Sequence, residues 1–275
     1  MPTLSRVGLG LAVLLCLAAA APAQEFSVYT RTVDLSTESI KAGSKTIFHA
    51  GKVYDCVDPR TDSPREVIIY DPGHRRFFII EESRGAYAEV TFDEIRRFLG
   101  LAEDKARELV GDLIRQPNPA APNAGELLQV QLQPQFVARY DEPGRRLRLE
   151  SPRFLYEAVC TAAPQPAVLD SYLKYADAIA ELNSVLHPQS LLPSPRWQLN
   201  RELRERGVLP VSVRRRLEFG PVSDLKAEHE WSWTLRDHDR QLISHWESLL
   251  SGQTLRPMPF KQLQQAVLGG GLAQK

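Results

Sequence analysis

The stretch VIIYDPGHRRFFII, residues 67–80, decides the fold class of this 275-residue chain. Proline fixes φ and glycine accepts positive φ, so Asp71-Pro72-Gly73 predicts a tight turn between two strands. Both strands are apolar on each face, because consecutive side chains of a strand point to opposite sides. The stretch therefore predicts an antiparallel hairpin in a sheet that is covered on both faces.

The neighbouring sequence extends this hairpin into a larger sheet. Short apolar runs recur between turn residues from Phe26 to Thr91, which is typical of a meander of antiparallel strands. Thr91 and Glu94 then form a capping-box pattern, and apolar residues at helical spacing follow to about Arg115. We expect this helix to cover one face of the sheet.

The second half of the chain repeats the mixture of strands and helices. It begins after a Pro-rich loop at 116–125, which cannot continue a helix and is a candidate boundary between two halves. The strand-like and helix-like runs beyond it are 136–140, 147–150, 154–160, 167–186, 194–207, 211–219, 228–236 and the residues after Asp237. The sequence thus predicts an α+β fold, a curved, half-barrel-like antiparallel sheet with helices packed on one face.

The N-terminus has the features of an export signal. Residues 1–23 combine Arg6, an apolar run from Val7 to Ala21 and a small-x-small ending, which predicts cleavage before Gln24. The alternative is a retained anchor, but the run is short for a membrane span and lacks basic stop-transfer flanks. We expect residues 24–275 to form a single exported domain, periplasmic or secreted, with no transmembrane anchor after cleavage.

The composition and net charge of the chain argue against one class of partner, nucleic acid. The chain has 34 basic and 34 acidic residues and 43% hydrophobic residues, which is ordinary for a folded protein. A net charge of zero leaves no electrostatic excess for a polyanion, so nucleic acid is not expected as a partner. The one tight basic run, Arg214-Arg215-Arg216, alternates between faces on a strand, and we expect it on a solvated edge strand.

Two cysteines remain after the signal, Cys56 and Cys160. An oxidising compartment permits a disulfide between them. The alternative is two separate buried thiols that act as small hydrophobes.

A search for catalytic and metal-binding motifs finds none. Gly-x-Ser-x-Gly, His-Glu-x-x-His, a Walker A loop and an EF-hand loop are all absent from the sequence. His229, His238 and His245 are candidates for a metal set, but His238 and His245 are seven residues apart, whereas helical zinc pairs sit at i and i+4. No cysteine or acidic residue is placed to complete the shell. We therefore predict no metal site, no cofactor and no catalytic residue.

The final strand carries the best candidates for ligand binding. Trp231 and Trp233 share one face with His229, and tryptophan is enriched where a ring meets a ligand. The alternative is that both are ordinary core residues. Together with the two-sided apolar hairpin, the predicted ligand-binding residues are Trp231, Trp233, Phe78 and Ile80.

The stretch from Glu66 to Thr91, with its apolar strands, Asp-Pro-Gly turn and Tyr87 before the helix, resembles the β-meanders of bacterial periplasmic lipoprotein carriers. The resemblance covers roughly residues 26–115. It implies a half-barrel whose concave side holds helices as a lid over an apolar cavity for acyl chains.

These observations support three functional hypotheses. The first is an exported, non-enzymatic cell-envelope protein that binds an apolar ligand or a lipidated partner in a cavity between sheet and helices. The second is an envelope interaction or scaffold module with a solid core. A hydrolase that uses His229 or His238 is the least favoured, since no motif supports it.

Overall fold

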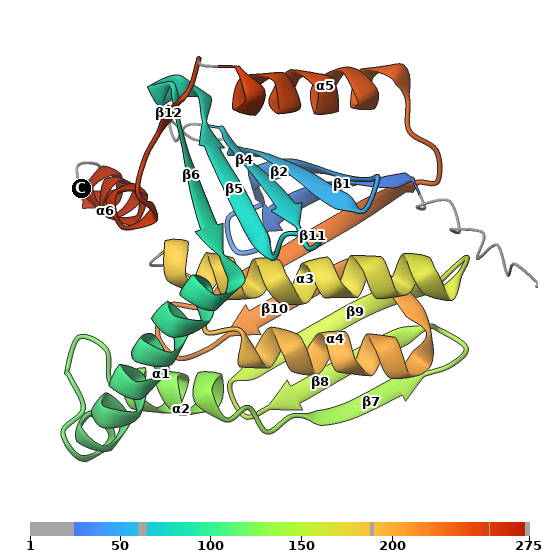
Figure 1. The fold of residues 1–275 in the computed structure, drawn as a ribbon. Helices are drawn as coiled ribbons and strands as arrows, with labels where there is room; N and C mark the ends of the chain where they lie inside the picture. The colour runs from blue at the N-terminus through green and yellow to red at the C-terminus, as the bar shows by residue number, and fades with distance from the viewer. Residues whose placement is uncertain (1–24, 60–64, 188–189, 253, 273–275) are drawn as a thin grey trace, which may run out of the picture.

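The computed structural model describes residues 25–59, 65–187, 190–252 and 254–272. The predicted signal peptide therefore lies outside the described residues. Within them the chain forms one 12-stranded sheet and six α-helices (Figure 1). None of the helices in this part of the chain combines the length and hydropathy that crossing a membrane requires.

The strands are β1 (Phe26–Asp34), β2 (Ser39–His49), β3 (Lys52–Pro59), β4 (Glu66–Asp71), β5 (Arg76–Glu81), β6 (Ala86–Thr91), β7 (Val137–Asp141), β8 (Arg146–Ser151), β9 (Phe154–Ala162), β10 (Val208–Leu217), β11 (Ser223–Ser232) and β12 (Arg256–Pro257). The helices are α1 (Phe92–Arg115), α2 (Ala124–Leu132), α3 (Pro166–Leu186), α4 (Ser194–Arg206), α5 (Asp237–Ser251) and α6 (Phe260–Leu272), with a short 3₁₀ turn η1 (Glu82–Arg84).

The sheet is continuous from one half of the chain to the other. Its strand order is β12-β6-β5-β4-β3-β2-β1-β11-β10-β9-β8-β7, and only the two-residue β12 pairs in parallel. The first strand pairs with β11 over Ser27–Asp34, which joins the N-terminal meander to the C-terminal strands. The Pro-rich segment between α1 and α2 thus lies outside a sheet that both halves share.

The predicted hairpin is present as β4 and β5. Val67 pairs with Ile80 and Tyr70 with Phe77 across the antiparallel ladder. The positive φ, however, falls at Arg75 (54°) and not at the glycine of the turn. The turn is closed by the Arg75 N–H, which donates to the Pro72 carbonyl at 3.2 Å.

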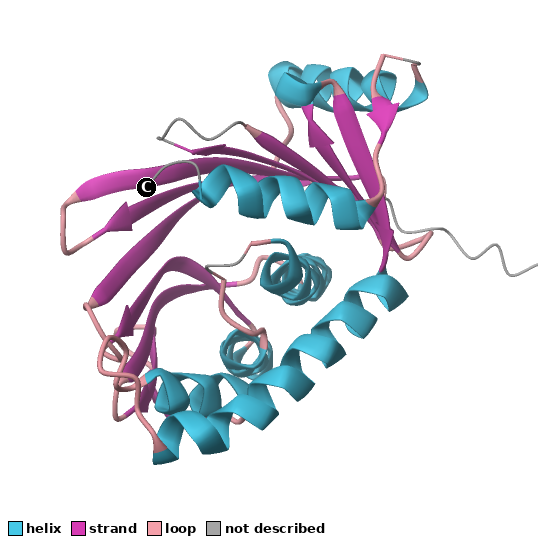
Figure 2. Ribbon diagram, turned by 90° about the vertical axis from the view of Figure 1, so that its left-hand side faces the viewer, coloured by secondary structure: helices cyan, strands magenta, loops and turns pink. Residues whose placement is uncertain are grey.

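Helices cover both faces of the sheet. In Figure 2 the sheet curves around α3 and α4, α1 crosses the open side, and α5 lies on the outer surface. The apolar residues of β4 and β5 divide accordingly, because Ile68 and Phe77 belong to the inner core and Val67 and Ile80 to the outer cluster with α5. The curved antiparallel sheet is confirmed, and α5 adds a cover on the second face that the two-sided hairpin required.

The predicted capping box starts α1. The Glu94 N–H donates to Thr91 Oγ1 at 3.2 Å, and the Thr91 N–H donates to Glu94 Oε2 at 2.9 Å. The first half of α1 buries Ile95 and Leu99 against the core, and its second half packs on α2. The helix therefore links the sheet to the α2 segment.

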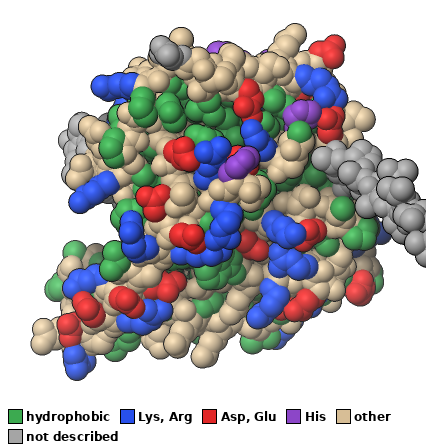
Figure 3. Space-filling view, viewed as in Figure 1, with side chains coloured by type: hydrophobic (Ala, Val, Ile, Leu, Met, Phe, Trp, Pro, Cys, Tyr) green, Lys and Arg blue, Asp and Glu red, His purple; other side chains and the backbone are tan. Residues whose placement is uncertain are grey.

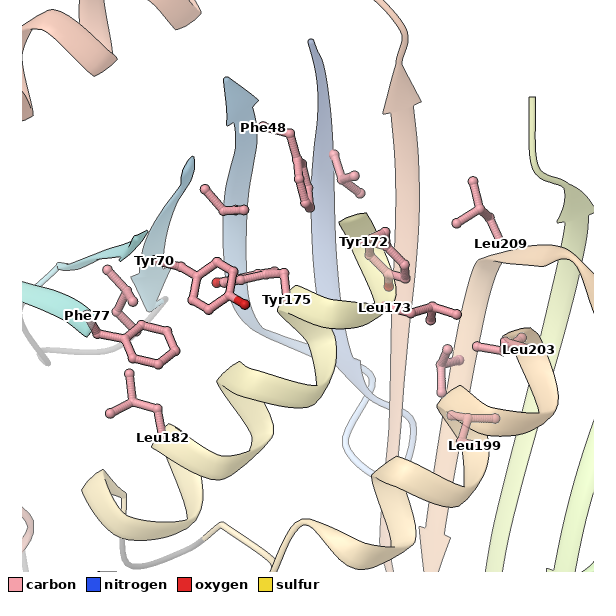
Figure 4. Close-up of a cluster of buried hydrophobic side chains, with 14 of the residues drawn as sticks. Phe48, Tyr70, Phe77, Tyr172, Leu173, Tyr175, Leu182, Leu199, Leu203 and Leu209 are labelled. Carbon is pink, nitrogen blue, oxygen red and sulfur yellow. The ribbon is translucent and has the colours of Figure 1, made fainter. Parts of the chain in front are cut away.

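The concave side of the sheet is filled by side chains of α3 and α4. Leu173 and Leu182 of α3 are completely buried, and Tyr175 meets Phe48 edge to face at 5.9 Å (Figure 4). Leu199 and Leu203 extend this packing from α4. The inner face thus holds a packed core along most of its length.

Candidate functional site

The sheet opens between β10 and β11 at one end. These two strands pair only as far as Ser212 and Glu228. Beyond that point β10 continues along β9, while β11 continues along β1 to Ser232. Beyond Glu228 the backbone of β11 therefore has no ladder partner on β10.

Aromatic side chains occupy the inner face at the split, and we call Phe26, Tyr172, Trp231 and Trp233 the aromatic surface. The rings of Trp231 and Trp233 stack at 5.4 Å with an interplanar angle of 17°. Phe26 lies 6.1 Å from Trp231 and 6.3 Å from Trp233, and Tyr172 of α3 meets Trp231 edge-on at 4.9 Å. The surface is graded from buried to open, because Phe26 is 1% exposed and Trp233 is 45% exposed.

The indole N–H of Trp231 already has a partner. It donates to the Pro210 carbonyl oxygen at 3.0 Å, across the split between the two strands. Trp231 consequently offers only the apolar face of its ring to a ligand.

His229 lies two residues before Trp231 on the same face. Its Nδ1 is 2.9 Å from Thr30 Oγ1, and its buried Nε2 has no hydrogen-bond partner among the described residues. Burial, followed by the positive charge of Arg196, lowers the pKa of His229 to about 4, so the ring is neutral at pH 7. In the described part of the chain no carboxylate contacts this histidine to orient it as a catalytic base.

The four predicted ligand-binding residues do not form one site. Trp231 packs against the inner core and Trp233 stacks on Trp231, but Ile80 and Phe78 belong to the outer cluster under α5. Ile80 is completely buried there, and Phe78 carries the guanidinium of Arg76 over its ring at 4.6 Å. The structure therefore does not bring Phe78 and Ile80 together with the tryptophans, because strand alternation separates the two faces of a sheet without telling which one is concave.

The two cysteines are free thiols in the structure. Cys56 lies on β3 against the outer cluster and Cys160 lies on β9 in the inner core, with four strands between them. Five strand spacings amount to about 24 Å along the sheet, and a disulfide needs Cα atoms within about 7 Å. The bridge between Cys56 and Cys160 is thus not formed, and the alternative of two separate thiols describes the structure.

The three histidines considered for a metal are dispersed. His229 is on the inner face, whereas His238 and His245 are on α5, where His245 Nε2 lies 3.7 Å from Glu82. Across the described ranges no group of three or more histidine, cysteine or acidic side chains is arranged to hold a metal ion.

The expectation that Arg214, Arg215 and Arg216 lie on a solvated edge strand is wrong. Their strand, β10, lies between β9 and β11 and is not an edge strand. Arg214 and Arg216 form ion pairs with Asp224 and Glu218, while Arg215 sits opposite Tyr156 on the inner face. Strand alternation in the sequence places Arg215 on the opposite face from Arg214 and Arg216. The position of β10 inside the sheet, however, depends on the strand order.

Neither the charges on the face in Figure 3 nor two hollows among the described residues offer a stronger site. On the face in Figure 3, basic and acidic side chains are interspersed and form no large patch of one sign. A hollow of about 610 Å³ lies at the sheet edge between β6, the end of α5 and β12, and one of about 190 Å³ lies between α1 and α2. Both are open to solvent and lie away from the aromatic surface.

No model of a known protein family matches the chain, and no curated protein sequence matches it either. The function must therefore be argued from the geometry of the molecule.

Proposed function

We propose that the protein is an exported, non-enzymatic component of the cell envelope that binds an apolar group, from a small molecule or a lipidated partner, on the aromatic surface. The observation that carries this proposal is the Trp231–Trp233 stack, whose outer ring is 45% exposed beside a fully buried phenylalanine. The exposed Trp233 ring continues the buried aromatic cluster to the surface of the molecule, and contiguous exposed apolar surface marks interaction sites.

The chemistry of the aromatic surface favours an apolar occupant. Trp231 and Trp233 stack on one another, and the Trp231 N–H is already bonded to the Pro210 carbonyl oxygen. Binding there would therefore be driven by the removal of hydrocarbon from water, and the Trp231 N–H is not free to select a polar group. An acyl chain, the ligand that the resemblance to lipoprotein carriers implies, has the required chemistry.

The interaction or scaffold module remains the second candidate, and one observation favours it. Leu173, Leu182, Leu199 and Leu203 are completely buried, so side chains fill the concave side where a carrier would hold its cavity. A ligand on the aromatic surface would accordingly lie at the open end of this core and not deep inside it.

Export predicts a defined mature N-terminus. Because residues 1–23 have the pattern of a cleaved signal, the protein isolated from its native host is expected to begin at Gln24 or within two residues of it. Intact-mass measurement and N-terminal sequencing check this. A mature protein that starts at Met1 would contradict the export part of the proposal.

Ligand binding is tested with a solvatochromic fatty-acid probe. Binding to the aromatic surface is expected to shift probe emission and quench tryptophan emission, and Trp233→Asp is expected to abolish both changes. An aspartate at position 233, the exposed end of the aromatic surface, introduces a charge that would lose its hydration when an apolar chain binds beside it. Circular dichroism verifies that Trp233→Asp is folded.

Trp246→Phe provides the matched control, because Trp246 lies under α5 on the opposite face of the sheet. It should reduce total tryptophan emission and leave probe affinity unchanged. Probe binding that is lost in Trp246→Phe and retained in Trp233→Asp would refute the proposed site.

A further inference from the structure

Two arginines face the inner side of the sheet, and neither has an acidic partner among the described residues. Arg196 acts on Tyr172 of the aromatic surface, whereas Arg215 lies farther along the sheet, opposite Leu225 of β11. Arg196 lies in the first turn of α4, and its Nε donates to Asn200 Oδ1 at 2.9 Å. Arg215 lies on β10 opposite Tyr156, and its buried Nε has no hydrogen-bond partner in the described part of the chain. Most other arginines near the sheet are paired with carboxylates, as Arg214 is with Asp224.

Three neutral side chains complete this group. Burial raises the pKa of Tyr156, and the charges of Arg215 and Arg196 and a hydrogen bond from Arg215 act against that rise. Arg196 acts in the same way on Tyr172, and it also contributes to the lowered pKa of His229. We call Tyr156, Tyr172, Arg196, Arg215 and His229 the basic cluster.

The basic cluster holds more donors than acceptors. Each guanidinium group donates to one tyrosine hydroxyl, Arg215 to Tyr156 and Arg196 to Tyr172. The buried atoms Arg215 Nε and His229 Nε2 have no hydrogen-bond partner among the described residues. Partly buried positive charges without an anion are costly, and one negatively charged group would satisfy several donors at once. The cluster is joined to the aromatic surface directly, since Tyr172 belongs to both and contacts Trp231 at 4.9 Å.

We propose that the basic cluster binds the anionic head group, a carboxylate or a phosphate, of an amphiphile whose apolar chain lies on the aromatic surface. This inference rests on the proposed function and specifies its ligand class. Arg196 and Arg215 supply the charge, and the hydroxyls of Tyr156 and Tyr172 supply additional hydrogen bonds. The ligand is an amphiphilic anion, with its charged end against α4 and β10 and its chain directed toward Trp233.

The test compares decanoate with decanol, which has the same chain length and no charge, by titration of tryptophan emission at neutral pH. Decanoate is expected to bind about tenfold more tightly or better, because charge-assisted hydrogen bonds to guanidinium are the strong ones. Arg215→Gln should remove this preference and leave decanol affinity unchanged. Arg215→Lys, which keeps the charge, should restore part of it.

Arg216→Gln is the matched control, because Arg216 is the next residue on β10 and points to the other face, where it pairs with Glu218. It should change neither affinity. Thermal unfolding of each variant shows whether it is folded, and Arg196→Gln replaces Arg215→Gln if the latter is not.

Excess inorganic phosphate distinguishes the two sources of the anion. If phosphate competes with decanoate but not with decanol, the basic cluster also accepts a free ion. If phosphate does not compete with decanoate, the preference belongs to the head group of an amphiphile.

Equal affinity for decanoate and decanol, unchanged in Arg215→Gln, would overturn the head-group site and leave the proposed function standing. Binding of neither compound would refute the proposed function itself. The two failures are therefore distinguishable in one set of titrations.

Discussion

Replacing Trp246 by alanine is expected to lower the free energy of unfolding by about 3–5 kcal/mol, the range for large aromatic residues in a core. Trp246 is 2% exposed and stacks on Tyr54 at 6.3 Å, where α5 covers the outer face of the sheet. Its cluster contains Ile47, Val67 and Ile80, which would face the resulting cavity. Urea denaturation followed by circular dichroism measures the loss.

Trp233→Ala is the comparison within the same protein. Because Trp233 is 45% exposed, its removal should cost clearly less than the removal of Trp246. Equal losses of unfolding free energy in the two variants would mean that Trp233 is a core residue. A loss below about 1 kcal/mol in Trp246→Ala would mean that the packing of α5 on the outer face contributes little to stability.

Asp55→Asn is expected to change how stability depends on pH. Burial raises the pKa of Asp55 to about 6, against the hydrogen bonds from Tyr175 and Thr46, at 2.8 and 2.9 Å, which lower it. The pKa is higher in the folded state than in the unfolded state, so the folded protein retains the proton more strongly. The stability contributed by this group is thus complete below about pH 4 and is lost as the pH rises through 6.

Two pKa units correspond to about 3 kcal/mol. The stability of Asp55→Asn relative to the unchanged protein should therefore increase by up to about this amount between pH 3.5 and pH 7, because asparagine keeps the acceptor and has no proton to lose. The comparison with the unchanged protein is needed because His229 also makes stability depend on pH. Its lowered pKa makes the free energy of unfolding rise with pH from about pH 4 to 6.5, opposite to the effect of Asp55. Urea denaturation at both pH values measures the difference.

Asp58→Asn, on the same strand, serves as the matched control, because that side chain is 54% exposed. Its effect should be small at both pH values. A relative stability of Asp55→Asn that is the same at pH 3.5 and pH 7 would contradict the raised pKa of the buried Asp55 carboxyl.

Local signals in the sequence were sufficient for the fold class. The hairpin of β4 and β5, the capping box at Thr91 and the helix that follows depend on neighbouring residues, and the structure contains all three. The need for cover on both faces could also be predicted, because Val67 to Tyr70 is apolar without interruption. These features are set within a few residues of chain.

The site could be predicted only in part, because its geometry depends on which distant strands become neighbours. Alternation placed His229, Trp231 and Trp233 on one face, but it could not show that Phe78 faces the other side. Arg215 becomes an inward-facing residue because β10 lies between β9 and β11. Such pairings join residues far apart in the chain and have no local signal.

The most direct test of the proposed binding surface is a titration of ¹⁵N-labelled protein with decanoate, followed through the indole N–H signals of its four tryptophans. Single substitutions assign the signals. We expect the Trp231 and Trp233 signals to shift together and saturate at one equivalent, while the Trp246 signal on the opposite face of the sheet does not move. Unchanged Trp231 and Trp233 signals at saturating decanoate, or a shift confined to Trp246, would contradict the proposed binding surface.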